Sequence, residues 1–337
     1  MKVMDKKKLV RVIATIIISF VMFSVFILDI VTLVLCNKYE KNYTLTTEDF
    51  TLSSGDDRIH FLNTGNSDCI LLESNGRFAL IDSGEGDDNP RKTTDYEGYK
   101  DEVVAYIKKV AKNTDGEVYL DFILGTHNHY DHIGNFYEII NDEEIKIGRA
   151  YFKKYNEDVS TDLEQGAWGN IKTYTDIINS LNEKGVTLIE NLPNWEFNFG
   201  DFRLLFINTV TPPELNGNGE NANSVGVIVT KGEKRAFLAA DFTHDSGLEE
   251  LYGDKIGDVD LLKIGHHGYF GSSSQDFLKE LKPEIAICTN YLGKIYPNVK
   301  WNLTMVAKAP IYATAHRNGI IATFTDDNKI ILTEKIM

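Results

Sequence analysis

The residues best suited to chemistry lie in one segment, Thr126-His127-Asn128-His129-Tyr130-Asp131-His132-Ile133-Gly134. It follows the apolar run 120–124, which predicts a buried strand. Alternate residues of an extended loop point the same way, so His127 and His129 can bind one metal ion. Asp131 and His132 can then turn toward a second. Imidazole and carboxylate suit zinc, and also manganese or iron. A histidine-rich surface loop is the alternative, and the dense spacing at a strand end favours the metal site.

Two further strand ends carry residues of the same types. Asp241 follows Leu238-Ala239-Ala240, and His266-His267 follow Leu262-Lys263-Ile264-Gly265. Taken alone, Asp241 could equally be a helix N-cap, and a histidine pair is more often structural. Together with the first segment, they bring ligands from three strand ends to one edge of the fold, where catalytic sites commonly lie.

The elements that must position these residues are short strands and helices. Apolar runs followed by turn residues predict strands at 59–62, 69–73, 78–81, 202–207, 225–230, 235–240, 260–264, 285–289, 320–324 and 329–333. Helical spacing predicts helices at 99–112, 171–181 and 274–281. Strand runs first and mixed α and β afterwards favour an α+β fold, a two-sheet sandwich flanked by helices, over a single parallel sheet.

The N-terminal region has a different composition. Residues 1–11 are basic, and residues 12–36 form an apolar run longer than the ~20 residues that cross a bilayer. We predict a cytoplasmic stub at 1–11, a transmembrane anchor at 12–36, a linker at 37–57 and a catalytic domain at 58–337. The basic flank predicts a single-pass protein of the cell membrane with its catalytic domain outside the cytoplasm. A cleaved signal peptide and a buried core helix are the alternatives.

Charge limits the partners that this chain can have. The formal net charge is −15 at pH 7. An acidic surface repels phosphate backbones, so charge does not support nucleic acid as a partner. The expected partners are a small-molecule or phosphodiester substrate, and the membrane through the N-terminal helix. The sequence does not determine the oligomeric state.

The motifs resemble those of a known family. The pattern His-x-His-x-Asp-His, a strand-end aspartate and His-His-Gly resembles the metallo-β-lactamase superfamily, and within it the hydrolase domain of the ComEC competence proteins and its stand-alone relatives. The segments 61–69, 80–84 and 221–225 resemble further motifs of that branch. The likeness covers residues 58–333 and implies a four-layer αββα sandwich after one transmembrane helix.

The resemblance also implies roles for the ligand-type residues. Two divalent cations are expected, zinc first, with manganese or iron as alternatives. His127 and His129 would bind one cation; Asp131 and His132 would bind the other. Asp241 would bridge the two, and one of the next pair would complete the second site. We assign His266 to the metal and His267 to catalysis, with the choice between them open.

Four residues are expected to support the site, and one usual ligand is missing. Asp82 would orient the ligands, and Asn221, Asn223 and Ser224 would contact the ligands from behind or contact the substrate. Between His132 and Asp241 the chain contains no histidine, so the segment 221–224 stands where many relatives have a further ligand.

The implied function is metal-dependent hydrolysis. A metal-bound hydroxide would attack a phosphodiester in nucleic acid, a small molecule or the cell envelope, with Asp131 or Asp241 accepting the proton. The alternatives are hydrolysis of a lactone, lactam or thioester at the same site, and a non-catalytic binding module.

Overall fold

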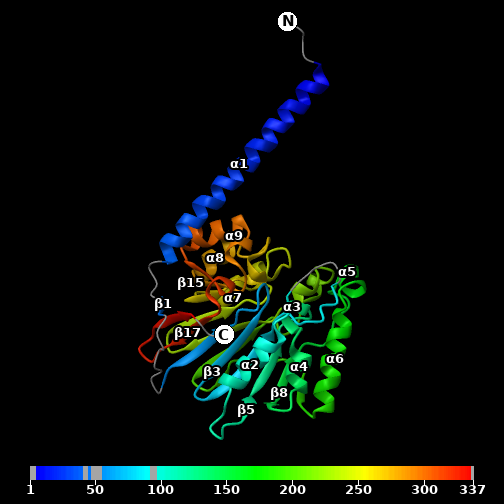
Figure 1. The fold of residues 1–337 in the computed structure, drawn as a ribbon, viewed down its shortest axis with the longest axis vertical. Coiled ribbons are helices and arrows are strands. Elements are labelled where there is room, and N and C mark those ends of the chain that lie inside the picture. Colours follow the sequence, from blue (N-terminus) through cyan, green and yellow to red (C-terminus); the bar gives the residue numbers. More distant parts are fainter. Residues whose placement is uncertain (1–4, 41–44, 47–54, 92–96, 335–337) are drawn as a thin grey trace.

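The structure, a computed structural model, describes residues 5–40, 45–46, 55–91 and 97–334. Within these residues, one long helix, α1 (Lys6–Glu40), projects from a body of stacked sheets and helices (Figure 1). The predicted linker at 37–57 lies largely outside the described residues. The predicted domain boundaries therefore stay predictions.

Two large sheets form the centre of the body. In spatial order, the first contains β1 (Leu45–Thr46), β18 (Ile330–Glu334), β17 (Ile320–Phe324), β2 (Asp57–Phe61), β3 (Cys69–Ser74), β4 (Arg77–Ser83), β6 (Phe122–Gly125), β8 (Arg149–Phe152) and β9 (Thr187–Ile189). The second contains β10 (Phe197–Phe199), β11 (Phe202–Ile207), β12 (Gly226–Lys231), β13 (Lys234–Leu238), β14 (Leu261–Lys263), β15 (Ile285–Cys288) and β16 (Ile311–Ala313). A separate pair is formed by β5 (Val118–Leu120) and β7 (Ile145–Ile147).

Helices cover the outer face of each sheet. The first sheet packs against α2 (Lys100–Val110), α4 (Phe136–Asn141) and α6 (Asn170–Glu183). The second packs against α7 (Leu248–Ile256), α8 (Gln275–Leu281), α9 (Pro297–Trp301) and η5 (Asn302–Ala307). The shorter helices are α3 (Tyr130–Ile133), α5 (Asp162–Gly166), η1 (Pro213–Leu215), η2 (Glu220–Asn223), η3 (Gly265–Gly268), η4 (Leu292–Lys294) and α10 (Thr314–Arg317).

The burial of strand residues explains why the strands read as continuous apolar runs. In β3, Ile70 and Leu72 face the second sheet, while Cys69 and Leu71 face the helices. Side chains alternate along a strand, so a strand covered on both faces is apolar throughout. The cores between the sheets and beneath the helices confirm the predicted four-layer αββα sandwich.

The predicted strand at 120–124 is divided in two. β5 pairs with β7, whereas β6 joins the first sheet between β4 and β8. The break falls at Asp121, whose carboxylate pairs with Arg77 at 2.6 Å and whose N–H donates to the Phe78 carbonyl at 2.7 Å. These bonds hold the chain where it passes from one sheet to the other.

The helix α1 is long and apolar enough to cross a membrane. Apolar side chains from Leu9 to Ile27 are exposed, so this part is not a core helix of the body. Its C-terminal part packs against α9, η5 and β16. There the Asp29 carboxylate pairs with the buried Lys300 ammonium at 3.0 Å.

Candidate metal centre

The predicted ligands meet at the carboxyl ends of parallel strands from both sheets. β4 and β6 run parallel in the first sheet, as do β13 and β14 in the second. His127, His129 and the short helix α3 follow β6, Asp241 follows β13, and the histidine pair in η3 follows β14. Parallel strands end at the same edge of a sheet, so residues far apart in sequence face one another there.

Four imidazole rings are each held through one nitrogen by a buried oxygen. One N–H of each ring donates to an oxygen whose position is fixed by the surrounding fold. The pairs are His132 Nδ1 to Asp82 Oδ2 at 2.7 Å, His267 Nδ1 to Thr289 Oγ1 at 3.1 Å, His129 Nε2 to Glu164 Oε1 at 2.9 Å, and His127 Nδ1 to Thr126 Oγ1 at 3.2 Å. The Thr289 hydroxyl in turn donates to Asp68, whose Oδ1 lies 3.2 Å from His267 Nδ1. Such partners fix the tautomer and leave the opposite nitrogen free to bind a metal.

The opposite nitrogens converge on the carboxylate of Asp241. His127 Nε2 lies 3.6 Å from its Oδ2 and 3.1 Å from His129 Nδ1. On the other side, Nε2 of His132 and of His267 lie 3.1 Å and 3.5 Å from its Oδ1, and 3.2 Å from each other. Asp241 therefore lies between two groups of imidazole nitrogens, as a bridging ligand would.

The residues present fit two divalent cations. Both oxygens of Asp241 are buried and accept no hydrogen bond. An unsatisfied buried carboxylate is costly unless a cation compensates it. Two nitrogens that bind one tetrahedral metal at ~2.0–2.1 Å lie about 3.3 Å apart, close to the spacing within each histidine pair. Imidazole and carboxylate donors suit zinc, manganese and iron.

The electrostatics also favour positive charge beside Asp241. Burial alone would lower the pKa of His132, but Asp241 and Asp82 outweigh it and raise that pKa well above its usual value. Burial alone would raise the pKa of Asp241, yet His132 and His267 hold it well below its usual range. Burial, followed by the charge of His132, lowers the pKa of His127. A cation at this point would take the place of the proton on His132.

The structure distinguishes the two adjacent histidines. His267 is fully buried and belongs to the group around Asp241, whereas His266 lies outside both groups. The His266 side chain is 29% exposed, and its Nε2 lies 3.8 Å from Asp241 Oδ2. Both residues have positive φ, 47° and 50°, a strained conformation that turns their rings in different directions. Of the two histidines between which the sequence left the choice open, His267 is the one that lies in the group around Asp241.

Asp131 lies beside the second group. Its Oδ2 is 3.6 Å from His267 Nε2, and its Oδ1 accepts from Arg91 at 3.4 Å. Arg91 also pairs with Glu85 at 3.0 Å. Burial, followed by the charge of Asp131, raises the pKa of Glu85 to about 8.

The predicted supporting residues behave differently from one another. Asp82 accepts from His132 Nδ1 at 2.7 Å and from the Thr126 amide at 2.8 Å. Ser224 Oγ accepts from the Asp241 amide at 3.3 Å. The side chain of Asn223 bonds to Thr211 and Glu220 and so belongs to the framework. Asn221 Oδ1 is buried without a hydrogen-bond partner.

Several residues that the sequence did not single out complete the centre. Asp68 orients His267 and forms an ion pair with the buried Lys263. In the sequence, the position of Asp68 inside the motif 61–69 was the one sign that it could belong to the site. Glu164 bonds to His129, and Glu220 accepts from the Asn128 amide at 3.1 Å. Glu164 lies in α5 and Glu220 in η2, two short helices far from the histidine segment in the chain, so only the fold reveals that they reach it.

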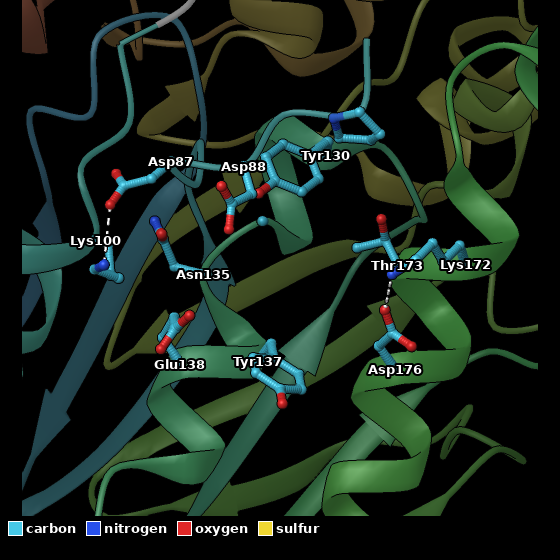
Figure 2. A pocket seen from close by; sticks show the side chains of 12 residues that line it. Asp87, Asp88, Lys100, Tyr130, Asn135, Tyr137, Glu138, Lys172, Thr173 and Asp176 are labelled. Carbon is cyan, nitrogen blue, oxygen red and sulfur yellow. Dashed lines mark hydrogen bonds and ion pairs between the residues drawn. The ribbon is translucent and has the colours of Figure 1, made fainter. Parts of the chain in front are cut away.

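A separate hollow of about 480 Å³ lies beside α3 on the outer side of the first sheet (Figure 2). Figure 2 shows the acidic side chains of Asp87, Asp88, Glu138 and Asp176 around it. None of the predicted metal ligands lines this hollow among the described residues. The cluster around Asp241 is therefore the candidate site.

Comparison with known proteins gives a family and several relatives. Residues 62–289, more than half of the chain, match the family described as the metallo-beta-lactamase superfamily. Recombination protein 2 of Haemophilus influenzae is 23% identical over 124 residues, which cover 37% of this chain and 15% of that protein. This chain therefore corresponds to a small part of that relative's length.

Solved structures of related fold have low sequence identity. The metallo-beta-lactamase fold protein YhfI from Bacillus subtilis has a TM-score of 0.48 and 13% identity, covering 77% of this chain and 96% of that chain. Zn(2+)-bound PqqB from Methylobacterium extorquens has a TM-score of 0.44 and 11% identity, covering 76% and 97%. CmlA, a diiron beta-hydroxylase from Streptomyces venezuelae, has a TM-score of 0.42 and 16% identity, covering 73% and 47%.

The family match spans the strands that carry the histidines and Asp241, and the layers around them are those predicted from the motifs. This chain belongs to the metallo-β-lactamase superfamily.

Proposed function

We propose that this chain is a metal-dependent phosphodiesterase with two divalent cations, zinc first. The observation that carries the proposal is the Asp241 carboxylate, which has no hydrogen-bond partner and stands between two convergent histidine pairs. His127 and His129 would hold one cation; His132, His267 and Asp131 would hold the other. The weak similarity to Recombination protein 2 supports the ComEC-like branch.

Bound cations would act as Lewis acids on a phosphate oxygen and lower the pKa of a water molecule. In the hydrolysis, the water oxygen forms a bond to phosphorus and one P–O ester bond breaks. The products are a phosphomonoester and an alcohol, and the proton lost by water ends on the alcohol oxygen. Asp131, whose Oδ2 lies 3.6 Å from His267 Nε2, would hold this proton, and the partly exposed His266 would contact the leaving group.

We also propose that α1 anchors the enzyme in the cell membrane, with its N-terminus in the cytoplasm and its catalytic body outside. The length and apolar character of α1 support the anchor. The basic residues before it support the orientation.

The test combines metal analysis with turnover. The purified full chain should contain zinc or manganese and hydrolyse bis-p-nitrophenyl phosphate. Asp241→Ala should lose both properties, whereas Asp276→Ala, a change of an exposed aspartate in α8, should retain them. If the chain binds metal but hydrolyses only a p-nitrophenyl ester or a lactone, the result would instead support a carbonyl hydrolase. A chain that binds no metal would contradict the proposal and favour the binding module.

A further inference from the structure

The anchor helix is fixed to the body through a charged pair. Asp29 of α1 lies 3.0 Å from the ammonium of Lys300, which is buried in α9. Thr32, one turn further along α1, is also fully buried. The C-terminal part of α1 is thus docked against α9, and Figure 1 shows α1 leaving the body beside that helix. Docking fixes which face of the body is turned toward the N-terminal part of α1.

The length of α1 places the membrane boundary at this pair. From Val12 to Leu28 the helix has about 17 residues, which rise about 26 Å, close to the thickness of a bilayer core. The apolar side chains from Leu9 to Ile27 are exposed, as lipid contact requires. Asp29 then follows the span at the interface, where its carboxylate avoids the cost of a mid-membrane charge. Lys300 and α9 consequently lie at the level of the lipid headgroups.

The helix α9 also leads directly to the metal centre. Its N-cap residue, Tyr296, accepts through its carbonyl from the Lys300 amide at 3.0 Å, one turn away. The Tyr296 ring lies 6.0 Å from that of Tyr269. Tyr269 in turn lies 5.4 Å from the ring of His266 and 6.5 Å from that of His267. A continuous set of contacts therefore joins the anchor to the histidine pair.

Aromatic side chains on this path are exposed. Phe270 is 62% exposed and Tyr296 is 42% exposed, and their rings lie 6.1 Å apart. We call Tyr269, Phe270 and Tyr296 the aromatic rim. Aromatic residues concentrate at membrane interfaces, and exposed apolar groups beside a site commonly mark a contact surface. The rim adjoins the anchor, so the surface that it fits is the membrane itself.

Resting on the proposed phosphodiesterase function, we propose that the metal centre opens through the aromatic rim onto the membrane that α1 crosses, and that its substrate is a lipid whose headgroup contains the phosphodiester. The acyl chains stay in the bilayer while the headgroup reaches the site past Phe270 and His266. The net charge of −15 favours a zwitterionic headgroup over a nucleic acid or a strongly anionic lipid. Water adds across one P–O ester bond of the headgroup, giving a phosphomonoester and an alcohol.

A fluorescence measurement tests the placement without relying on turnover. The full chain, with Trp168, Trp195 and Trp301 changed to Phe, receives Phe270→Trp and is reconstituted in vesicles of brominated phosphatidylcholine. Bromine should quench this probe. A matched chain that keeps only Trp195 should not be quenched. Trp195 is 65% exposed and lies with Asp121 and Phe122 at the start of β6, the opposite end from the metal centre. Equal absence of quenching in both chains overturns the membrane-facing rim.

Turnover tests the substrate class. The metal-loaded full chain should hydrolyse phosphatidylethanolamine in phosphatidylcholine vesicles and also bis-p-nitrophenyl phosphate in solution. Phe270→Ser should lower the ratio of lipid to soluble turnover by about tenfold, the loss expected for one exposed phenyl contact. Asp29→Asn should lower lipid turnover and leave soluble turnover unchanged.

The two substrates separate failure of this inference from failure of the proposed function. Turnover of the soluble diester without the lipid overturns the lipid substrate and leaves the phosphodiesterase intact. An equal effect of Phe270→Ser on both substrates overturns the rim as a lipid contact. Absence of turnover on both substrates, with the Phe270→Trp probe quenched, overturns the phosphodiesterase and its lipid substrate while supporting the membrane-facing rim.

Discussion

At the scale of single residues, each histidine of the candidate metal centre is positioned by the group that accepts a hydrogen bond from its ring. His132 and His129 each donate one ring N–H to a buried carboxylate, on Asp82 and Glu164 respectively, and His267 is linked to the Asp68 carboxylate through the Thr289 hydroxyl. A carboxylate partner fixes the ring and makes the opposite nitrogen a stronger donor to a metal. The roles of neighbouring histidines can therefore be separated by experiment.

His267→Ala and His266→Ala form a matched pair for the ligand assignment. His267 is buried in the group around Asp241, so its loss should remove about one metal ion per chain. His266 lies outside that group, so its loss should leave the metal content unchanged while turnover decreases. Elemental analysis of both variants measures this difference. If only the His266 variant loses metal, His266 is the metal ligand, as the sequence analysis assigned it.

Glu164→Gln separates a role toward the metal from a role in folding. Glu164 caps α5 in a capping box with Thr161, a position that glutamine also fills. Burial opposes its charge, but the bond to His129 holds the pKa of Glu164 at about 2. The variant should keep its thermal stability and bind metal about 10–100-fold more weakly. Competition with a chelator measures the affinity, and unchanged affinity would contradict the role.

The buried His60, which lies outside both groups around Asp241, should make the free energy of unfolding depend on pH. Burial lowers its pKa below the usual 6.5, although Glu73 opposes this. Below pH 6.5 the unfolded chain therefore binds a proton that the folded chain does not. The free energy of unfolding should fall, as pH decreases from 6.5 toward the lowered pKa, by up to about 1.4 kcal/mol per pH unit. In urea denaturation, His60→Gln should reduce this slope relative to the parent chain, and equal slopes would contradict the prediction.

At the scale of elements, strand ends set the positions of the ligands. The end of β14 lies so close to the segment after β13 that a Cβ on Gly265 would be 2.1 Å from the Phe242 carbonyl oxygen. A hydrogen bond next to this close approach places the histidine pair beside Asp241, because the His266 amide donates to the Ala240 carbonyl at 3.0 Å.

Gly265→Ala should therefore damage both stability and the metal centre. Relief of the clash requires the two strand ends to separate, which should cost about 1–3 kcal/mol and lower the metal content. Gly293→Ala is the control, because a Cβ there meets no atom within 4 Å. Thermal unfolding and elemental analysis of both variants provide the comparison. Similar behaviour of the two would show that the close approach is not required.

At the scale of the whole molecule, an ion pair between Asp29 and Lys300 joins α1 to the body of sheets and helices. Asp29→Asn leaves the Lys300 ammonium buried without its carboxylate, whereas Lys300→Met removes the buried charge. Breaking one side of a buried pair is more destabilising than replacing both. Asp29→Asn alone should therefore lower the melting temperature more than the double variant does, measured for the full chain in vesicles. Additive effects would indicate that the two groups are not coupled.

The sequence by itself indicated the candidate metal ligands and determined most of the strands. His127, His129 and Asp131 could be recognised because metal ligands are dense in one short segment, and strands such as β3 and β11 because apolar runs are local signals. The family followed from the same motifs.

Only the tertiary structure decided which residues meet. It divided the run 120–124 between two sheets, brought Asp68 and Glu164 to the histidines, and placed His267 rather than His266 in the group around Asp241. It also paired Asp29 with Lys300, 271 positions apart. These contacts depend on the packing of strands and loops that are distant in the chain, and a local pattern contains no information about such a partner.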